Sequence, residues 1–297
     1  MAGVVIHGAV AALFTPFTTR GESIDEGALR AHVEWLLGNG IHGLMTCGTT
    51  GEGPLLTNAE RRRVLELVVD VTAGRVPVIA HIGSLTTRET IDLARHAVDC
   101  GAAVVSVVTP LYYRLADAEL IAHYCTVADS VPETSVFLYN IPQYTGNRIS
   151  VAVAEAVACR CPNVVGIKDS AGDLAHLLSF VSVRGGSFQV ICGSDELILQ
   201  ALEGGACASV SGNANVVPDL VVPLFEAFWR GDREGARCWQ ERLDEVRREL
   251  CSNGLSLMKR GLDLRGLRGG CVRPPLLEAD DTAVERLRRR LGALGLL

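Results

Sequence analysis

A lysine at the end of a short apolar run could act as a nucleophile. The run covers residues 163–167, follows Pro162, and is followed directly by Lys168 and Asp169. Short apolar runs bounded by turn residues are typical of buried parallel strands, so Lys168 would stand at a strand's carboxyl end. An amine held in a dry cleft loses its proton more easily and can attack a substrate carbonyl. The alternative is a solvated surface lysine, the commoner state of this residue type.

Other residues that could do chemistry follow other short apolar runs. They carry hydroxyl, phenol or carboxylate groups, or they expose backbone N–H groups in glycine-rich loops. They are Gly48, Thr49 and Thr50 after 41–46, Tyr112 and Tyr113 after 103–108, Tyr139 at the end of 134–139, Asp195 and Glu196 after 187–192, and Ser211 and Asn213 after 206–210.

Several of these candidates also have a purely structural interpretation. Loop 48–53 could be only a tight turn, or its N–H groups and threonines could bind a carboxylate. Tyr139 could be a core aromatic with a local partner, or a phenol that moves the protons that imine formation requires. Asp195 and Glu196 could simply begin a helix. Asp169 is interpreted as a helix-start or solvent residue.

Strand-like and helix-like segments alternate along the chain and must position these residues. Helix-start patterns of the Ser/Thr-x-x-Glu type begin at Ser23, Thr57 and Thr86. The predicted strands are 7–17, 41–46, 77–81, 103–108, 134–139, 163–167, 187–192 and 206–210, and the helices between and after them include 117–129, 150–159, 173–183 and 218–230. Alternation of this kind demands parallel strands with crossover connections. Eight such units favour an α/β fold of the (β/α)8 TIM-barrel type, and no GxGxxG follows a strand to suggest a dinucleotide-binding fold.

The strand pattern stops after residue 231. Apolar residues recur at helical spacing from Trp239 to Leu250, and further helices are expected near 256–264 and 281–294. We therefore expect a (β/α)8 barrel catalytic domain at 1–231 and a C-terminal helical region at 232–297. In such a barrel the active site forms at the carboxyl ends of the strands, where the candidates above would converge.

Composition excludes several classes of partner. The 297 residues are 48% hydrophobic, enough for a large core. The net charge is -6 and basic and acidic residues are mixed, so we expect neither nucleic acid nor a membrane as a partner. No apolar run reaches membrane-spanning length and no secretion signal is recognisable. A cytoplasmic location is therefore expected.

Cysteines and histidines are scattered singly along the chain. The ten cysteines form no CxxC pair, and the seven histidines show no HxH or HExxH spacing. The sequence therefore supports no metal site. The cysteines are interpreted as buried small hydrophobic residues in a reducing compartment.

As a set, the motifs resemble those of the dihydrodipicolinate synthase / N-acetylneuraminate lyase family. They are Gly-Thr-Thr-Gly-Glu at 48–52, Tyr-Asn-Ile-Pro at 139–142 with Thr-Gly at 145–146, Gly-Ile-Lys-Asp at 166–169, Gly-Ser-Asp at 193–195 and Arg-Pro-Pro-Leu at 273–276. The match runs nearly end to end in the right order. The resemblance implies a class I aldolase-type lyase that acts on pyruvate or pyruvate-yielding 2-oxo acids through a lysine imine. It also implies no metal or dissociable cofactor, and a homo-oligomer, usually a tetramer and otherwise a dimer.

The resemblance further implies roles for individual residues. Lys168 matches the imine-forming nucleophile and Tyr139 the proton relay. Thr49 and Thr50 match residues that bind the pyruvate carboxylate, and Thr49 also links the tyrosine hydroxyls. Tyr112 matches the tyrosine that completes this relay across a subunit interface.

The other expected substrate-binding residues are assigned less directly. Val210 matches the position whose backbone carbonyl faces the bound pyruvate. Asp195, Glu196 and Asn213 could bind hydroxyl groups, and the two carboxylates argue against a phosphorylated substrate. The full set of expected substrate-binding residues is Thr50, Gly48, Val210, Asp195, Glu196, Ser211, Asn213 and Tyr144.

One departure from the family pattern bears on the substrate. Dihydrodipicolinate synthases typically carry an arginine two residues past the proline of the Tyr-Asn-x-Pro motif, to hold the carboxylate of aspartate semialdehyde; here Tyr144 stands there. A phenol removes that bidentate charge partner, although Arg148 could substitute. We therefore expect reversible cleavage of a non-phosphorylated 2-keto-3-deoxy sugar acid or a related hydroxylated 2-oxo acid. The alternatives are 4-hydroxy-tetrahydrodipicolinate synthase, condensing pyruvate with aspartate semialdehyde, and a catalytically silent barrel with a binding role.

Overall fold

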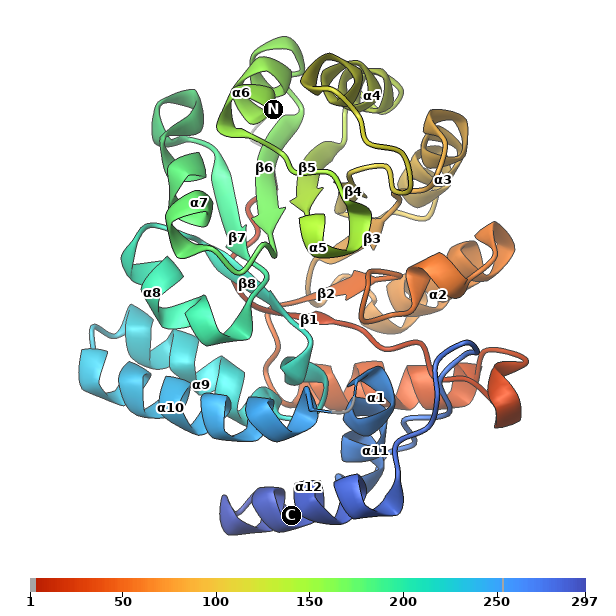
Figure 1. The fold of residues 1–297 in the computed structure, drawn as a ribbon, viewed down its shortest axis with the longest axis vertical. Coiled ribbons are helices and arrows are strands. Elements are labelled where there is room, and N and C mark those ends of the chain that lie inside the picture. The colour runs from red at the N-terminus through yellow and green to blue at the C-terminus, as the bar shows by residue number, and fades with distance from the viewer. Residues whose placement is uncertain (1–3, 253) are drawn as a thin grey trace. The chain divides into compact units, whose positions relative to one another are not determined.

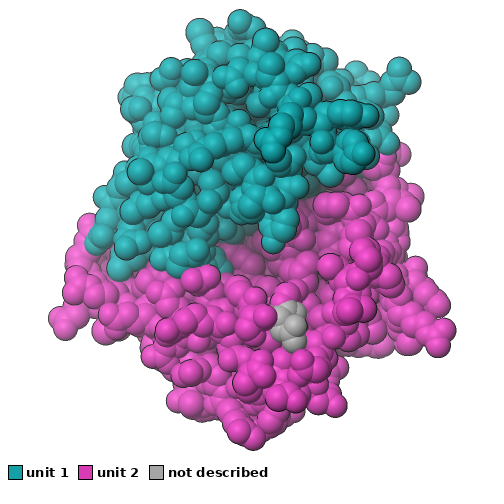
Figure 2. All heavy atoms as spheres, in the orientation of Figure 1, with its two compact units in different colours: residues 1–8, 77–210 teal, residues 9–76, 211–297 magenta. Residues whose placement is uncertain are grey.

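Eight parallel strands form a closed barrel in chain order in the computed structural model, which describes residues 4–252 and 254–297. The first strand is β1 (Gly8–Ala12) and the last is β8 (Ala208–Ser211). The predicted (β/α)8 TIM barrel is confirmed. Two compact units can be distinguished within the chain, residues 1–8 with 77–210 and residues 9–76 with 211–297, coloured teal and magenta in Figure 2.

The first unit carries most of the strands. They are β3 (Val78–His81), β4 (Val104–Val108), β5 (Ser135–Asn140), β6 (Val164–Asp169), β7 (Gln189–Cys192) and nearly all of β8. Its helices are α3 (Thr87–Asp99), α4 (Asp117–Asp129), α5 (Pro142–Thr145), α6 (Val151–Arg160), α7 (Leu174–Ser179) and α8 (Ile198–Glu203). Almost every residue of these strands is buried, which explains why the strands read as continuous apolar runs.

The pairing of β5 with β6 fixes the neighbours of the candidate lysine. Tyr139 lies opposite Lys168 in this register, and Asn140 lies opposite Asp169. The register shifts between Val136 and Phe137. Gly166 is required beside this shift, because a Cβ at that position would collide with the ring of Phe137. A larger residue at 166 would therefore push the two strand ends out of register.

The second unit combines the first two strands with the C-terminal helices. It contains β1, β2 (Gly43–Thr46), α1 (Glu26–Gly38), α2 (Asn58–Thr72), α9 (Pro218–Trp229), α10 (Arg233–Leu250), α11 (Gly254–Leu264) and α12 (Asp281–Ala293). Figure 1 shows α10 running alongside α9, and α10 also packs on α11 and α12. After α11 the chain returns to the segment that follows β1. There Cys271 N donates a hydrogen bond to Phe17 O at 3.1 Å. The division of the chain at residue 231 into two domains stays a prediction.

Helix starts were predicted correctly at two of three positions. Thr57 forms a full capping box with Glu60, and Thr86 caps α3 by accepting a hydrogen bond from Glu89 N. The start predicted at Ser23 is wrong, because Asp25 is the N-cap of α1. Ser23 instead belongs to a turn, in which its carbonyl accepts from Thr18 N at 2.8 Å. This turn forms because residues 17 and 24 pair as an antiparallel bridge.

Several element boundaries also differ from the prediction. The strand expected at 7–17 is only Gly8–Ala12 long. The helix expected at 173–183 ends at Ser179 and continues as a 3-10 segment, Phe180–Gly186. β6 is longer than expected and includes both Lys168 and Asp169. Apolar runs mark where a strand is buried, but they do not mark where its ladder of hydrogen bonds ends.

None of the ten cysteines, all of which lie in the described part of the chain, forms a disulfide, and they are not all buried. Cys159, Cys238 and Cys251 are exposed, which corrects the expectation of burial for these three. Cys159 and Cys238 lie on the outward faces of α6 and α10, and Cys251 is the residue at which α10 ends. Among the described residues, no helix has the length and apolar character needed to cross a membrane.

Leu287 tests how far the C-terminal helices depend on their packing. It is fully buried on α12, and it faces α11 at Gly261. We expect Leu287→Ala to lower the free energy of unfolding by about 2–5 kcal/mol, because it leaves a cavity in a packed interface. Urea denaturation followed by circular dichroism measures this change. A loss below about 1 kcal/mol would show that α12 adds little to the stability of its unit.

Candidate active site

Lys168 is buried at the carboxyl end of β6, in the first unit. Its side chain is only 6% exposed, and its Nζ lies 4.2 Å from the ring centroid of Tyr139 on β5. Tyr139 is buried as well, and its ring meets the edge of His81 with 5.8 Å between centroids. The surface-lysine interpretation is therefore wrong. The amine lies against the face of an aromatic ring, where water is largely excluded.

Asp169 organises the residues beside the lysine. It is buried, and its carboxylate accepts hydrogen bonds from Asn140 Nδ2 at 2.8 Å and Ala171 N at 3.1 Å. His176 Nδ1 on α7 lies 3.1 Å from its other oxygen. The expectation that Asp169 is a helix-start or solvent residue is wrong. β6 continues through Asp169, and its side chain is buried against α7. Asp169 thus joins β5, β6 and α7 next to Lys168.

The loop that carries Tyr112 is held from behind by one buried asparagine. Asn147 Nδ2 donates to the carbonyls of Pro110 at 2.7 Å and Tyr113 at 2.8 Å, and its Oδ1 accepts from Leu115 N. Tyr112 itself is 85% exposed and has a φ of +83°. A bulky residue in that region is strained. The loop therefore presents a tyrosine to the outside of this chain at a conformational cost.

Tyr144 and Arg148 do not form a carboxylate clamp in the first unit. Tyr144 lies on α5 and is 70% exposed. Arg148 Nη2 is paired with Asp173 Oδ2 at 3.1 Å, and both side chains are about half exposed. The guanidinium that could have replaced the missing arginine is thus engaged with a carboxylate of its own chain.

Three other predicted residues of the first unit lie at the ends of β7 and β8. Val210 is buried within β8. Asp195 and Glu196 open a 3-10 helix, Asp195–Leu197, as their helix-start interpretation predicted. Asp195 is buried and Glu196 is exposed. Of these two carboxylates, therefore, Glu196 is the one that faces water.

The second unit holds the glycine-rich loop after β2. Thr49 and Thr50 are half-buried there, and Gly48 is buried. The loop is closed on itself, because Glu52 N donates to Thr49 O at 3.1 Å and Gly53 N donates to Gly48 O at 3.0 Å. A Cβ at Gly53 would collide with the carbonyl oxygen of Cys47. Glycine at this position is therefore a condition for the turn that carries the threonines.

The loop after β8 lies beside the threonine loop within this unit. A Cβ built at Gly212 would lie 3.4 Å from Thr50 Oγ1. Ser211 and Asn213 are buried on either side of this glycine. Asn215 fixes the loop to the end of β1, because its Nδ2 donates to Ala12 O at 2.7 Å and its Oδ1 accepts from Phe14 N at 3.2 Å. Thr50 thus lies beside Gly212, the residue between Ser211 and Asn213.

Two cysteines border these strand ends but are poor nucleophiles. Burial raises the pKa of the Cys47 thiol to about 11, at the start of the threonine loop. Burial also raises the pKa of Cys192, the last residue of β7, to about 12. Both remain protonated near neutral pH, and a thiol is far less nucleophilic than a thiolate. Neither thiol is therefore a candidate nucleophile near neutral pH.

Comparison with known proteins places the chain in a family. Residues 5–294 match the sequence model described as the dihydrodipicolinate synthetase family. The chain belongs to the dihydrodipicolinate synthetase family. Its members are lyases and synthases that use a lysine Schiff base with pyruvate, so the protein is an enzyme of this type. The family expected from the motifs is confirmed.

Individual relatives are similar over almost their whole length. The 4-hydroxy-tetrahydrodipicolinate synthase of Methanopyrus kandleri is 39% identical over 99% of this chain and 98% of its own. An uncharacterized DapA-like lyase of Halobacterium salinarum is 40% identical over 98% and 95%. Among solved structures, the prophage protein YagE of E. coli K12 in complex with pyruvate has a TM-score of 0.94, 30% identity, and coverage of 99% and 100%.

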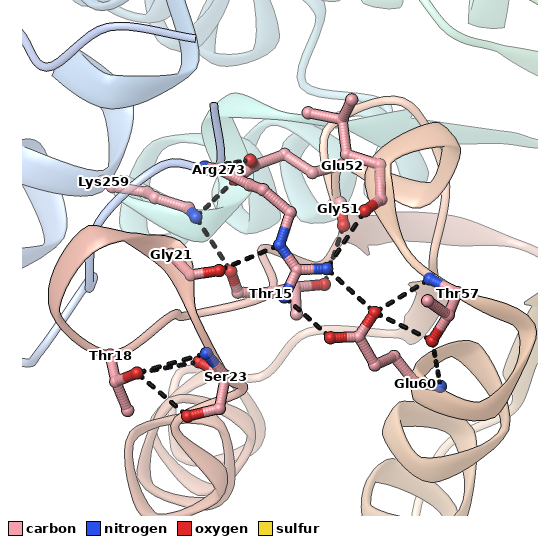
Figure 3. Close-up of polar contacts among 11 residues, drawn as sticks. Thr15, Thr18, Gly21, Ser23, Gly51, Glu52, Thr57, Glu60, Lys259 and Arg273 are labelled. Carbon is pink, nitrogen blue, oxygen red and sulfur yellow. Dashed lines mark hydrogen bonds and ion pairs between the residues drawn. The ribbon is translucent and has the colours of Figure 1, made fainter. Parts of the chain in front are cut away.

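This member of the dihydrodipicolinate synthetase family has a second charged cluster that the motifs did not identify. It lies in the second unit, where Figure 3 shows Arg273 reaching Glu60 and Gly21. Arg273 Nη1 also donates to Leu55 O at 3.0 Å. Arg273 donates to both oxygens of Glu60, at 2.8 and 2.7 Å. Arg273 belongs to the Arg-Pro-Pro-Leu motif, so the sequence contained a signal, but nothing in it named Glu60 as the partner.

The pairing of Glu60 with Arg273 predicts a defined pH dependence of stability. The Arg273 guanidinium, aided by Thr57, holds the pKa of Glu60 at about 2 instead of its usual 4.5. A carboxyl whose pKa is lower in the folded state stabilises fully above its unfolded pKa and loses that contribution as pH falls. We expect the stability difference between wild type and Glu60→Gln to shrink from about pH 4.5 to about pH 2.

Urea denaturation of both proteins across this pH range measures the difference directly. Subtracting the variant from wild type removes the contribution of the other carboxylates, which titrate in both. A difference that stays constant through the range would show that Arg273 does not favour the ionised form of Glu60.

Proposed function

We propose that this protein is a class I lyase that forms an imine between Lys168 and a 2-oxo acid and releases or consumes pyruvate. The observation that carries the proposal is the buried amine of Lys168, 4.2 Å from the ring centroid of Tyr139. The amine stands at the carboxyl end of a barrel strand, where active sites of this fold form, and an amine is the nucleophile that this chemistry needs. Membership of a family that uses a lysine Schiff base supports the same assignment.

The proposed reaction proceeds through one covalent intermediate. The Lys168 amine adds to the 2-oxo carbon and expels that oxygen as water, which leaves a protonated imine. The iminium draws in the electron pair of the bond between C3 and C4, and the C4 hydroxyl loses its proton, so that an aldehyde leaves. The resulting enamine takes up a proton at C3, and water then hydrolyses the imine to pyruvate and free lysine. Each step moves protons and electron pairs only, so the mechanism needs no metal or dissociable cofactor.

Protons are moved by a phenol in this proposal. Tyr139 is the relay because it lies beside the Lys168 amine on the paired strand. Its partner is Tyr112 of a neighbouring copy, linked through Thr49. The exposure and strained backbone of Tyr112 support a role outside its own chain. A homo-oligomer, a tetramer or a dimer, is therefore part of the proposal.

The carboxylate of the 2-oxo acid is assigned to the glycine-rich loop. Thr49 and Thr50 supply hydroxyl and backbone N–H donors, Gly48 allows close approach, and the Val210 carbonyl faces the bound pyruvate. Backbone N–H groups in a glycine-rich turn suit an anion without requiring a cationic side chain. The half-buried state of both threonines leaves them accessible to a small ligand.

We propose a hydroxylated 2-oxo acid, such as a non-phosphorylated 2-keto-3-deoxy sugar acid, as the substrate. Tyr144 replaces the arginine that would hold aspartate semialdehyde, and Arg148 is paired with Asp173. The hydroxyl groups of a sugar acid are assigned to Asp195, Glu196, Ser211 and Asn213, with Tyr144 at the far end. The competing proposal is 4-hydroxy-tetrahydrodipicolinate synthase, which the name of the Methanopyrus kandleri relative favours.

Trapping the imine tests the covalent step. We expect wild-type protein treated with pyruvate and borohydride to gain the mass of pyruvate less one oxygen atom, because reduction makes the imine permanent. Peptide mapping by mass spectrometry should place the adduct on Lys168. Lys168→Ala should form no adduct and lose at least about a thousandfold of the activity, since the nucleophile is gone.

Lys168→Arg is the matched control for this test. It places a basic side chain of similar length at this position, and a guanidinium cannot form the imine at neutral pH. Absence of an adduct on the intact protein would contradict the proposal and would favour the catalytically silent barrel.

The choice of substrate is tested by comparing two reactions of the same preparation. We expect cleavage of 2-keto-3-deoxygluconate or a related sugar acid to exceed condensation of pyruvate with aspartate semialdehyde by at least about tenfold in kcat/KM, because a missing bidentate pair costs on the order of 1.4 kcal/mol or more. Coupled assays for pyruvate release and pyruvate consumption measure the two rates. Robust condensation without cleavage would establish the synthase and reject the substrate proposed here.

A further inference from the structure

A buried ion pair reaches the threonine loop from the C-terminal helical segment. Lys259 on α11 is 0% exposed, and its Nζ is paired with the carboxylate of Glu52, the residue two positions after Thr50. We propose that Lys259 and Glu52 are positioning residues that hold loop 48–53 in the conformation that binds the carboxylate of the 2-oxo acid. This inference rests on the proposed function for its link to substrate, but the positioning itself can be measured separately.

All three N–H donors of the Lys259 ammonium have partners within the protein. Besides Glu52, the ammonium donates to Thr15 O at 2.8 Å and to Cys271 O at 2.7 Å, as drawn in part in Figure 3. Its Nζ also lies 4.6 Å from the ring centroid of Phe17. Burial pushes the pKa of Lys259 below its usual value, and the Glu52 carboxylate acts in the opposite direction. All three N–H groups of the ammonium are therefore hydrogen-bonded within the protein, and the side chain has no exposed surface through which it could contact a substrate.

Glu52 makes the loop depend on this cation. Its backbone has a φ of +56°, a left-handed conformation that costs energy for a residue with a side chain. Its carboxylate is buried and is held by Lys259 and by the backbone N–H of Arg273 at 2.8 Å. Its own N–H donates to Thr49 O. Holding the carboxylate thus holds a strained residue whose backbone is bonded directly to one of the two threonines.

A second connection reaches the same loop through Thr15. The carbonyl of Thr15 accepts from Lys259, and its hydroxyl donates to Gly51 O at 2.7 Å (Figure 3). Gly51 follows Thr50 directly. Both routes from the ammonium therefore end on the residues that flank the threonines, one through Glu52 and one through Gly51. An ion pair with a purely structural role could contact any residue of the loop. This one acts on Gly51 and Glu52, the two residues that directly follow Thr49 and Thr50.

The variants that test this are Lys259→Met, Glu52→Gln and the double variant. Each single change leaves one buried charge without its partner, whereas the double variant replaces the pair by neutral groups of similar size. Leu287→Ala is the matched control, because it destabilises the same unit from α12, where Leu287 packs on α11 at Gly261. Should a single variant fail to fold, the double variant decides.

Two measurements are made on each protein. The first is the pyruvate concentration that gives half-maximal borohydride trapping. We expect it to rise about tenfold or more in the single variants and in the double variant, and to change less than about twofold in Leu287→Ala, because only the former release the loop. The second is hydrogen exchange of the amides at 48–53, which we expect to quicken in the pair variants and to stay at the wild-type rate in Leu287→Ala.

The outcomes separate the two proposals. Exchange at 48–53 that is unchanged in the pair variants overturns the positioning role, whatever the activity. Faster exchange with an unchanged pyruvate requirement also overturns it, because the loop would then move without affecting binding. If wild type forms no pyruvate adduct at all, the proposed function fails, while the exchange data still decide whether the ion pair holds the loop.

Discussion

Taking an ionisable group out of water requires a partner, and this constraint organises both units of the protein. An unpaired buried charge is strongly unfavourable. Asp169 meets the requirement with Asn140, His176 and the Ala171 backbone. Lys259 meets it with a carboxylate and two carbonyls. Lys168 is also buried, and its Nζ lies 4.2 Å from the ring centroid of Tyr139.

Buried asparagines connect the strand ends to the loops that follow them. Asn140 donates to Asp169 and accepts from Ile149 N, Asn147 holds the loop around Tyr112, and Asn215 ties the loop after β8 to β1. An amide has both donors and an acceptor, so one side chain can bind two stretches of backbone at once. Loops built in this way keep their conformation without regular secondary structure. The catalytic proposal depends in part on such loops, because Tyr112 and Asn213 lie on them.

Family membership and substrate choice rest on different residues. In the proposal, the lysine, the tyrosine on the paired strand and the glycine-rich loop serve the chemistry that the family shares. In the proposal, Tyr144 and Arg148 bear on the second substrate, and both side chains are exposed. A change at such a position costs little stability. It can therefore redirect the enzyme from one electrophile to another while the imine chemistry is retained.

The sequence by itself determined the alternation of strands and helices and the barrel, because buried parallel strands must be apolar and turns need glycine at fixed places. The family followed from the resemblance of its motifs. The sequence also placed Lys168 and Tyr139 at strand ends. Only the tertiary structure decided that Asp169 points inward, that Asp25 and not Ser23 caps the first helix, and that Glu52 pairs with Lys259. Those facts depend on residues far apart in the chain, and the register and burial that join them are created only when the chain folds.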